Sequence, residues 1–257
     1  MATSLIARID AAWYPGGAQW DDVGFRRLIG QHVTPESVVL DLGAGSGYVS
    51  HMNLRGVVAR MCGVDLDPRV VDNRFLDDAR VASAAQLPYE EGLFDVVFAN
   101  NVLEHLADPA DVFREVARVL RPGGVFLFKT PNRWHYVPIV AQLTPHCFHR
   151  FVNRLRGRAG DETFPTRYRA NTLGAVRRLA GGAGLLVERI ERLEGRPEYA
   201  RMTWPTYVLG AAYERLVNAS DALAAFRVVL MGVLRRPERA TDGGGAPTGT
   251  QPGRGTR

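Results

Sequence analysis

Short apolar runs alternate with helix-spaced apolar positions along most of the chain. Each run lies between glycine, proline or charged residues, which is typical of a strand buried on both faces of a parallel sheet. Such strands alternating with helices predict a doubly wound α/β fold, whose ligands bind beyond the carboxyl ends of the strands. The expected strands are residues 37–42, 61–65, 80–83, 94–99, 125–130 and 185–193.

Three segments show the apolar spacing of helices. In residues 108–120, Asp108 can cap a helix whose first residue is a proline. In residues 171–183, Asn171 is the expected cap and glycines close the helix. Residues 206–234 form a longer pattern, interrupted by charges that make membrane spanning costly. We expect this last helix to pack on the domain or on a second subunit; peripheral contact with a membrane surface is the alternative.

Composition changes this picture little. The 257 residues are 46% hydrophobic and 23% charged, as in an ordinary soluble protein. Of the 32 basic residues only Lys129 is a lysine, which we attribute to the base composition of the gene, and a net charge of +5 does not by itself indicate nucleic-acid binding. The cysteines, Cys62 and Cys147, are far apart, so we expect neither a disulfide framework nor a metal site. Residues 1–22 lack a secretory signal, which predicts a cytoplasmic protein.

Residues 38–47, VVLDLGAGSG, place three glycines directly after the first expected strand. Glycines at this point allow a sharp turn and a close approach to a ligand, although packing alone could also require them. The dinucleotide site of a nicotinamide oxidoreductase would need G-x-G-x-x-G, but the sixth position is Tyr48. Asp41 would repel a pyrophosphate and attract an ammonium group instead.

Asp65 ends the second expected strand, 22 residues after Gly43. An acid there can accept hydrogen bonds from both hydroxyls of a ribose. Asp67 is better placed to cap the turn that begins at Pro68, which leaves Asp65 for a ligand. An amino-acid group near Asp41 and a ribose near Asp65 together describe S-adenosylmethionine.

Four segments in this order, VLDLGAGSG, GVDLDP, LPYEEGLFDVVFANNVLEHL and LRPGGVFLFKTPN, resemble the class I S-adenosylmethionine-dependent methyltransferases, and among them the type-11 group. The resemblance covers about residues 36–190. It implies a Rossmann-like, mainly parallel seven-stranded sheet with helices on both faces, a helical lid insertion and a C-terminal helix. The expected organisation is a helical cap at 1–35, a methyltransferase domain at 36–195 with its lid at 133–169, a helical extension at 196–236 and a disordered tail at 237–257.

The resemblance also assigns residues to the cofactor, S-adenosyl-L-methionine. The glycine turn would line its methionine part, Asp65 would hold the ribose, and Leu66 would lie beside adenine. Asn100 would offer its backbone carbonyl oxygen to the ammonium group. Where the family usually has an aspartate after the third strand this chain has Ser83, a weaker hydrogen-bond acceptor. The expected cofactor-binding residues are Asp41, Gly43, Ala44, Gly45, Asp65, Leu66, Ser83, Ala84 and Asn100.

His105, past the fourth strand, is the candidate catalytic base because its ordinary pKa lies near about 6.5. Its alternative role is to shape the start of the following helix. The motif Asn/Asp-Pro-Pro-aromatic, found in enzymes that methylate amide or exocyclic nitrogens, is missing, which favours oxygen and then carbon as the acceptor atom. Residues 133–169 interleave arginines with aromatic residues, which suits a nucleic acid or an amphiphilic small molecule. The candidates for acceptor contact are Tyr14, Trp134, His135 and His146.

We therefore expect methyl transfer to a small or lipid-linked metabolite, with no specific nucleic-acid partner. RNA methylation is an alternative, but the arginines are confined to one segment and no RNA-binding domain is recognisable. A non-catalytic cofactor-binding protein of the same fold is a second alternative, which Ser83 favours and Asp41 and Asp65 oppose. Neither the acceptor nor the oligomeric state follows from the sequence.

Overall fold

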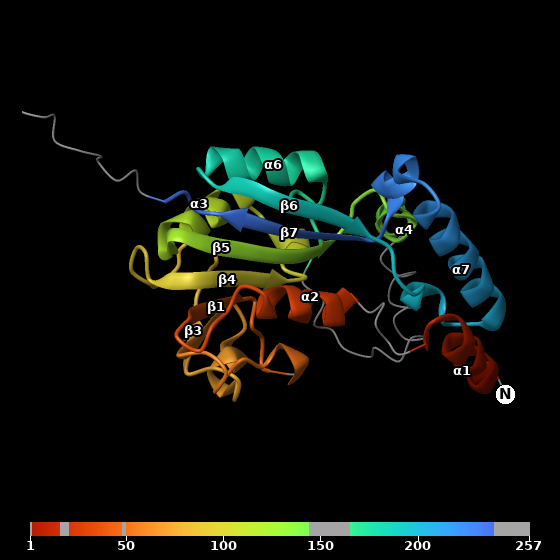
Figure 1. Ribbon diagram of the computed structural model, residues 1–257, viewed down its shortest axis with the longest axis horizontal. Helices are drawn as coiled ribbons and strands as arrows, with labels where there is room; N and C mark the ends of the chain where they lie inside the picture. The colour runs from red at the N-terminus through yellow and green to blue at the C-terminus, as the bar shows by residue number, and fades with distance from the viewer. Residues whose placement is uncertain (1, 16–20, 48–49, 144–164, 239–257) are drawn as a thin grey trace, which may run out of the picture.

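A twisted sheet forms the centre of the protein (Figure 1). The computed structural model describes residues 2–15, 21–47, 50–143 and 165–238, and in this part of the chain the seven strands have the order β3-β2-β1-β4-β5-β7-β6. The first five strands pair in parallel, whereas β7 pairs antiparallel with both β5 and β6. The mainly parallel, doubly wound sheet is therefore confirmed. The strands are β1 Val38–Leu42, β2 Arg60–Asp65, β3 Asp78–Val81, β4 Phe94–Asn100, β5 Leu120–Pro131, β6 Leu186–Leu193 and β7 Val229–Arg235.

Helices cover both faces of this sheet, as expected. One face packs against α3 and α6 through Phe113, Val116 and Val176, and the opposite face packs against α2 through Phe25 and Ile29. The helices are α1 Ala2–Trp13, α2 Asp21–Gly30, α3 Pro109–Val119, α4 Tyr136–Leu143, α6 Leu173–Gly182 and α7 Trp204–Asn218. Short 3-10 turns are η2 Ser50–Met52, η3 Pro68–Asp72, η4 Leu103–His105, η5 Glu198–Ala200 and η6 Asp221–Phe226.

The single helix expected over residues 206–234 is wrong in its second half. The helix α7 ends at Asn218, and residues 229–235 form β7, which lies between β5 and β6 in the sheet. Ser220 starts a separate 3-10 turn by accepting the N–H of Ala222, and the apolar run that follows is inserted as a buried strand. The last part of the helical extension expected at 196–236 therefore belongs to the central sheet.

Two expected helix caps also differ from the structure. Thr172, not Asn171, caps α6 by accepting the N–H of Ala175 at 3.1 Å. Asp108 occupies the cap position of α3 and a proline follows it, but its side chain makes no capping hydrogen bond. The displaced Asn171 is fully buried at the edge of the sheet.

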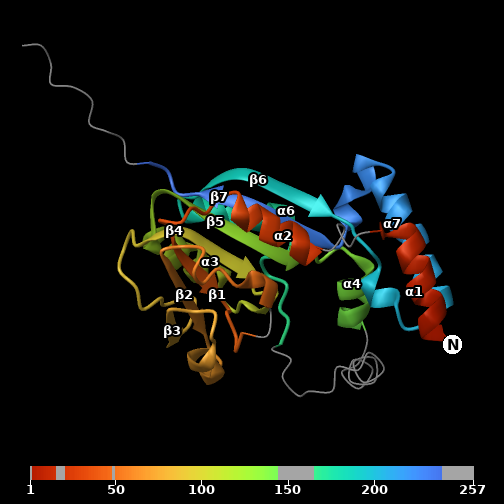
Figure 2. The same ribbon diagram turned by 60° about the horizontal axis from the view of Figure 1, so that its bottom comes forward.

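The helices α1 and α7 lie side by side and form a cap, which is set apart from the sheet in both ribbon views (Figures 1 and 2). Ile6 and Tyr14 of the N-terminal segment pack against Tyr207 and Ala211 of α7. The carboxyl ends of the parallel strands point toward this cap (Figure 1). The expected N-terminal cap over residues 1–35 is thus divided, because α2 belongs to the layer on the sheet. The expected disordered tail lies outside the described residues beyond residue 238.

Candidate functional site at the carboxyl edge of the sheet

The glycine turn after β1 has the conformation that the sequence predicted. Gly43, Gly45 and Gly47 all have positive φ angles, of 74°, 52° and 82°, which side chains other than glycine rarely adopt. A Cβ atom on Gly43 would lie 2.5 Å from a methyl carbon of Val102, so this glycine is also required for packing. A Cβ on Gly45 would meet nothing within 4 Å. The backbone is therefore open to a ligand at Gly45.

Asp65 fixes this turn from the end of β2. Its two carboxylate oxygens accept the N–H groups of Gly45 at 2.8 Å and of Asp67 at 2.9 Å. Asp67 in turn accepts the N–H of Arg69 and caps η3, as expected. Asp65 is therefore not wholly free for a ligand, but each carboxylate oxygen keeps a lone pair for a hydroxyl group.

Asp41 lies near Asp65, because it pairs across the two parallel strands with Gly63, two residues before Asp65, and the charge of Asp65 acts on it. Burial, and then the negative charge of Asp65, raise the pKa of Asp41 well above its ordinary value. A cation beside this carboxyl group would reverse the effect, since an opposite charge favours ionisation. The geometry is consistent with an ammonium group at Asp41.

The expected adenine side lies at the ends of β2 and β3. Leu66 is 63% exposed directly after Asp65, which leaves its side chain available to a flat ring. Ser83 is exposed, and its hydroxyl oxygen accepts the N–H of Ala85 at 3.2 Å. Ala84 packs partly against the core. Leu66 and Ser83 thus follow neighbouring strands with exposed side chains, and their contacts with adenine stay a prediction.

Asn100 belongs to a charged group that the sequence did not predict. Its Oδ1 atom is buried and accepts no hydrogen bond from the described residues, while its Nδ2 atom lies 3.5 Å from Asp22 Oδ1. The paired residue on β5 is Lys129, whose side chain is 1% exposed and forms ion pairs with Asp21, at 2.9 Å, and with Asp22. These ion pairs fasten the first turn of α2 to the carboxyl edge of the sheet. In the sequence, the feature that could have pointed to this charged group is that Lys129 is the only lysine of the chain.

Glu104 is a second site residue that was missed. It is 5% exposed, and its Oε2 atom accepts a hydrogen bond from the Thr130 hydroxyl at 3.0 Å. Thr130 accepts in turn from the amide of Asn171 at 2.7 Å. Burial raises the pKa of Glu104, although hydrogen bonds and the nearby charge of His105 counteract this. A buried carboxyl group of this kind is typical of functional sites.

His105 lies between Glu104 and the end of the expected lid. Its Nε2 atom is 3.9 Å from Glu104 Oε1, and its Nδ1 atom is 3.3 Å from the carbonyl oxygen of Pro165. The Glu104 carbonyl oxygen accepts the N–H groups of Arg167, at 2.6 Å, and of Tyr168, at 3.1 Å. Tyr168 has a positive φ of 50°, so this docked segment has an unusual backbone. Both nitrogens of the His105 ring therefore face protein oxygen atoms.

The described residues that were expected to contact the acceptor differ in their burial. Tyr14 is 8% exposed and donates its hydroxyl to Glu214 Oε2 at 3.1 Å, so it packs within the cap. Trp134 is 55% exposed, whereas the neighbouring His135 is 1% exposed. His146 lies outside the described residues.

His135 is buried with a second titratable group. Its ring lies 4.2 Å from that of Tyr136 and 5.5 Å from that of Tyr213, and its Nε2 atom is 3.7 Å from Glu194 Oε2. Burial lowers the pKa of His135 to about 4 and raises that of Glu194 to about 8. Burial therefore favours the neutral form of both groups. The structure places His135 in the interior, and its contact with the acceptor stays a prediction.

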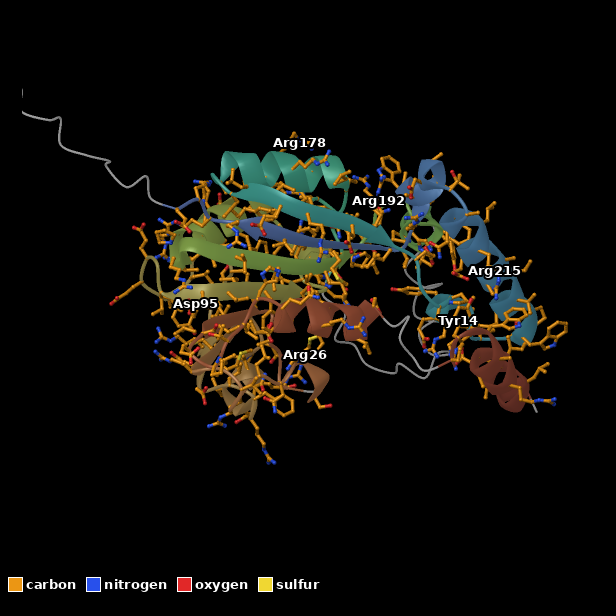
Figure 3. All side chains as sticks on the ribbon, in the orientation of Figure 1. Tyr14, Arg26, Asp95, Arg178, Arg192 and Arg215 are labelled. Carbon is orange, nitrogen blue, oxygen red and sulfur yellow. The ribbon has the colours of Figure 1, made fainter. Side chains whose placement is uncertain are left out.

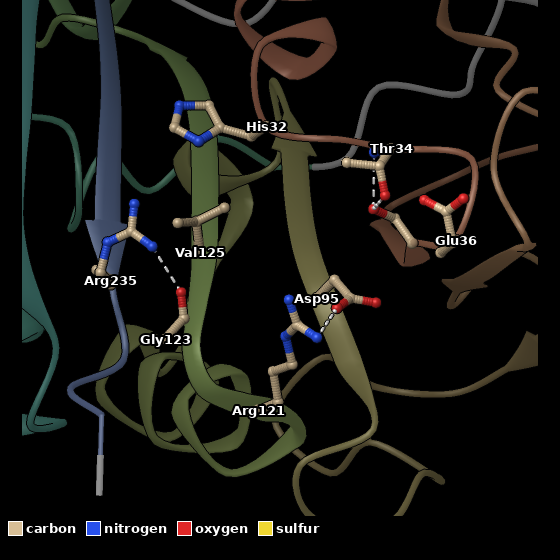
Figure 4. A pocket seen from close by; sticks show the side chains of 9 residues that line it. His32, Thr34, Glu36, Asp95, Arg121, Gly123, Val125 and Arg235 are labelled. Carbon is tan, nitrogen blue, oxygen red and sulfur yellow. Dashed lines mark hydrogen bonds and ion pairs between the residues drawn. The ribbon is translucent and has the colours of Figure 1, made fainter. Parts of the chain in front are cut away.

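A cavity of about 360 Å³ lies at the opposite, amino edge of the sheet (Figure 4). Its charges are largely neutralised within the protein, since Arg121 pairs with Asp95 at 2.7 Å and Arg235 pairs with Glu188. In a doubly wound fold ligands bind at the carboxyl edge, where the glycine turn lies. We therefore place the functional site at the glycine turn and not in this cavity.

Comparison with known proteins finds a family match within the middle of the chain. Residues 40–128, which include the glycine turn, Asp65 and Glu104, match a protein family described as "Methyltransferase domain". A probable S-adenosylmethionine-dependent methyltransferase of Mycolicibacterium smegmatis is 41% identical over 104 residues, which are 39% of this chain and 40% of the relative. A ubiquinone biosynthesis O-methyltransferase of Xanthomonas oryzae pv. oryzae is 36% identical over 37% of this chain and 43% of its own length. The chain thus spans about two fifths of these relatives.

Solved structures share the fold over a larger part of the chain. The geranyl diphosphate C-methyltransferase of Streptomyces coelicolor A3(2) has a TM-score of 0.56 and 18% identity, over 84% of this chain and 79% of that one. The [4+2]-cyclase SpnF has a TM-score of 0.55 and 18% identity, over 87% of this chain and 84% of that one. These likenesses establish the fold alone. Residues 40–128 of the chain are similar to the methyltransferase domain, and the chain is similar in part to the named S-adenosylmethionine-dependent and ubiquinone-biosynthesis methyltransferases.

Proposed function

We propose that the protein transfers a methyl group from S-adenosylmethionine to an oxygen or carbon atom of a small or lipid-linked acceptor. One observation carries the proposal. The carboxylates of Asp41 and Asp65 lie at the ends of adjacent strands, beside a glycine turn that is open at Gly45. A pyrophosphate would meet two acids there, whereas a ligand with an ammonium group and a ribose is matched at both.

The residues of this edge fit that cofactor. Asp65 has lone pairs left for ribose hydroxyls, Leu66 exposes an apolar surface for adenine, and the orphaned Oδ1 atom of Asn100 is a ready acceptor. Bound S-adenosylmethionine supplies an electrophilic methyl group. The chain then has to align the acceptor and, where the acceptor is a hydroxyl group, remove its proton.

His105 and Glu104 together could perform the proton transfer. We assign the proton to His105, and to Glu104, whose Oε1 atom lies 3.9 Å from Nε2, the role of stabilising the imidazolium that forms. For this His105 must exchange its contact with Pro165 for the acceptor hydroxyl. A plot of kcat/KM against pH for His105→Gln and Glu104→Gln tests the assignment. The acid limb of the profile should be lost in the first variant and displaced in the second.

The relatives support the acceptor class. One is named for O-methylation in ubiquinone biosynthesis, and a structure with the same fold is named for C-methylation of geranyl diphosphate. Both names describe small metabolites. This agrees with the lack of an Asn/Asp-Pro-Pro-aromatic motif after β4, where the chain reads Asn100, Asn101, Val102 and Leu103.

Calorimetric titration of the full chain with S-adenosylhomocysteine and with NAD tests cofactor choice. We expect binding of the first ligand only. Asp65→Asn should weaken it by about 1–3 kcal/mol because a charged acceptor is lost. Asp67→Asn is the matched control, since it removes the same charge two residues away and should leave the affinity nearly unchanged. Binding of NAD alone would end the proposal.

A protein of this fold that does not transfer methyl groups is the second candidate. One solved protein with the same fold is a [4+2]-cyclase, which favours this candidate, and so does the serine at position 83. Cell extract incubated with methyl-labelled S-adenosylmethionine distinguishes the two. Label that enters an extract molecule only when the protein is present establishes a transferase. Label in small or lipid molecules supports our acceptor class, whereas label in RNA, with binding that resists salt, would replace it with RNA methylation.

A further inference from the structure

The helix α7 exposes a face without a single charge. Leu209 and Leu216 are 70% and 60% exposed, and they continue a row of exposed residues at helical spacing. On a helix of a monomeric soluble protein the face turned to solvent is normally polar. The row consists of Pro205, Leu209, Ala212, Leu216 and Ala219.

The buried side of the same helix already has packing and hydrogen-bond partners within the cap. Tyr207 and Ala211 pack against α1, and the Tyr207 hydroxyl donates to Asp10. The outer leucines are therefore not needed for the cohesion of the cap. An exposed apolar face of this kind indicates an interaction with something outside the described fold.

Aromatic residues and cations border this face. Trp13 is 41% exposed and Trp204 is 50% exposed. The guanidinium of Arg215 lies 4.6 Å from the centre of the Trp13 ring, and Tyr14 and Arg215 both lie at the cap end of the molecule (Figure 3). Arg8 of α1 is also exposed.

The acids of the two helices are turned inward. Asp10 is held by Arg196 and Arg201, each at 2.6 Å, and Glu214 accepts from Tyr14 and Asn218. The exposed acids of the cap, Glu198 and Asp221, lie outside both helices and are paired with arginines. The exposed charged side chains of α1 and α7 themselves are therefore Arg8 and Arg215, of which Arg215 also pairs with Glu214 at 3.7 Å.

We propose that α1 and α7 dock the protein on an anionic lipid bilayer, with α7 lying in the plane of the headgroups. Apolar residues with bordering tryptophan and arginine suit this boundary, where leucines enter the acyl region and cations meet lipid phosphates. A second copy fits less well, because a twofold contact would bring Arg8 and Arg215 of one copy near those of the other. The proposal does not depend on methyl transfer. It would bring the carboxyl edge of the sheet, which faces the cap, close to lipid-linked acceptors.

Co-sedimentation of the full chain with vesicles tests this. Vesicles of phosphatidylcholine with phosphatidylglycerol should bind the protein, and those of phosphatidylcholine alone should bind it more weakly. Leu209→Glu combined with Leu216→Glu should lower the partition coefficient at least about tenfold, since two apolar side chains leave the bilayer and two negative charges approach it. The matched control is Val57→Glu with Leu186→Glu, which changes two residues that are 52% and 56% exposed at the opposite edge of the sheet.

Three outcomes would overturn the proposal. The first is a wild-type chain that does not sediment with anionic vesicles, and the second is equal loss of binding in both double variants. The third is a dimer in sedimentation velocity that dissociates in the Leu209/Leu216 variant without any vesicle binding, which would make this face a contact between copies. Far-ultraviolet circular dichroism of each variant confirms that the fold is retained.

Discussion

The buried ring of His135 makes a quantitative prediction about stability and pH. Burial lowers its pKa to about 4, whereas a histidine in an unfolded chain has a pKa of about 6.5. As the pH falls below about 6.5 the unfolded chain takes up the proton first, so the contribution of this group to stability is lost between about pH 6.5 and about pH 4. The full difference corresponds to about 3 kcal/mol, of which about 2 kcal/mol is lost between about pH 7.5 and about pH 5.

Replacing His135 by Asn removes the titration and keeps an acceptor near the place of Nδ1, which receives the N–H of Val137. Urea unfolding at about pH 7.5 and about pH 5 should show the wild type losing about 2 kcal/mol more than the variant. The smaller side chain of the variant lowers its unfolding free energy equally at both pH values, so this cost cancels when the loss between the two pH values is compared. His32→Asn is the control: burial also lowers the pKa of that ring, but it is only half-buried, so its difference should be smaller. Equal losses in wild type and His135→Asn would refute a buried neutral histidine.

Three further predictions follow from the site and the sheet. Binding of S-adenosylhomocysteine, which carries an ammonium group, should release protons and strengthen with rising pH because it lowers the pKa of Asp41; calorimetry in buffers of different ionisation enthalpy should show no such release in Asp41→Asn. Lys129→Met should lower the free energy of unfolding in urea by only about 1 kcal/mol, because its acid partners are 46% and 37% exposed and can be hydrated. Asp21→Asn with Asp22→Asn should lower it by about 3–5 kcal/mol, because a buried ammonium group is left unpaired. Gly232→Ala should lower thermal stability by about 1–3 kcal/mol, since its Cβ would lie 2.5 Å from a phenylalanine ring of β5; an unchanged Tm would contradict that packing.

Local signals in the sequence were sufficient for the parallel part of the fold. The run VVLDLGAGSG contains an apolar strand and the glycines that its turn requires, so both could be predicted without knowledge of the rest of the chain. The position of β7 could not. Residues 229–235 are mostly apolar, and no glycine or proline separates them from the preceding helix. They form a strand because they pair with β5 on one side and with β6 on the other. Tertiary context overrides helical periodicity in such a segment.

The same limit applies to the site. Asp65 could be placed from its distance to the glycine turn, because both belong to adjacent parallel strands. Glu104 could not be recognised, since its significance depends on Thr130 and Asn171, which are 26 and 67 residues further along the chain. A hydrogen bond between distant residues leaves no pattern in a single sequence. The sequence therefore suggested a helix cap for Asn171, whereas its side chain donates to Thr130.

Lys129 shows where composition and chemistry separate. In a chain with 32 basic residues arginine is the default cation, and an exposed arginine differs little from a lysine there. At position 129 the side chain is 1% exposed and ends between two carboxylates. An ammonium group has three N–H donors, which can all find acceptors in so small a volume. A guanidinium group is planar and larger, and its five N–H donors all need acceptors. Lys129→Arg should therefore be worse than Lys129→Met, although it keeps the charge, and equal stability of Lys129→Arg and the wild type would show that the space is not restrictive.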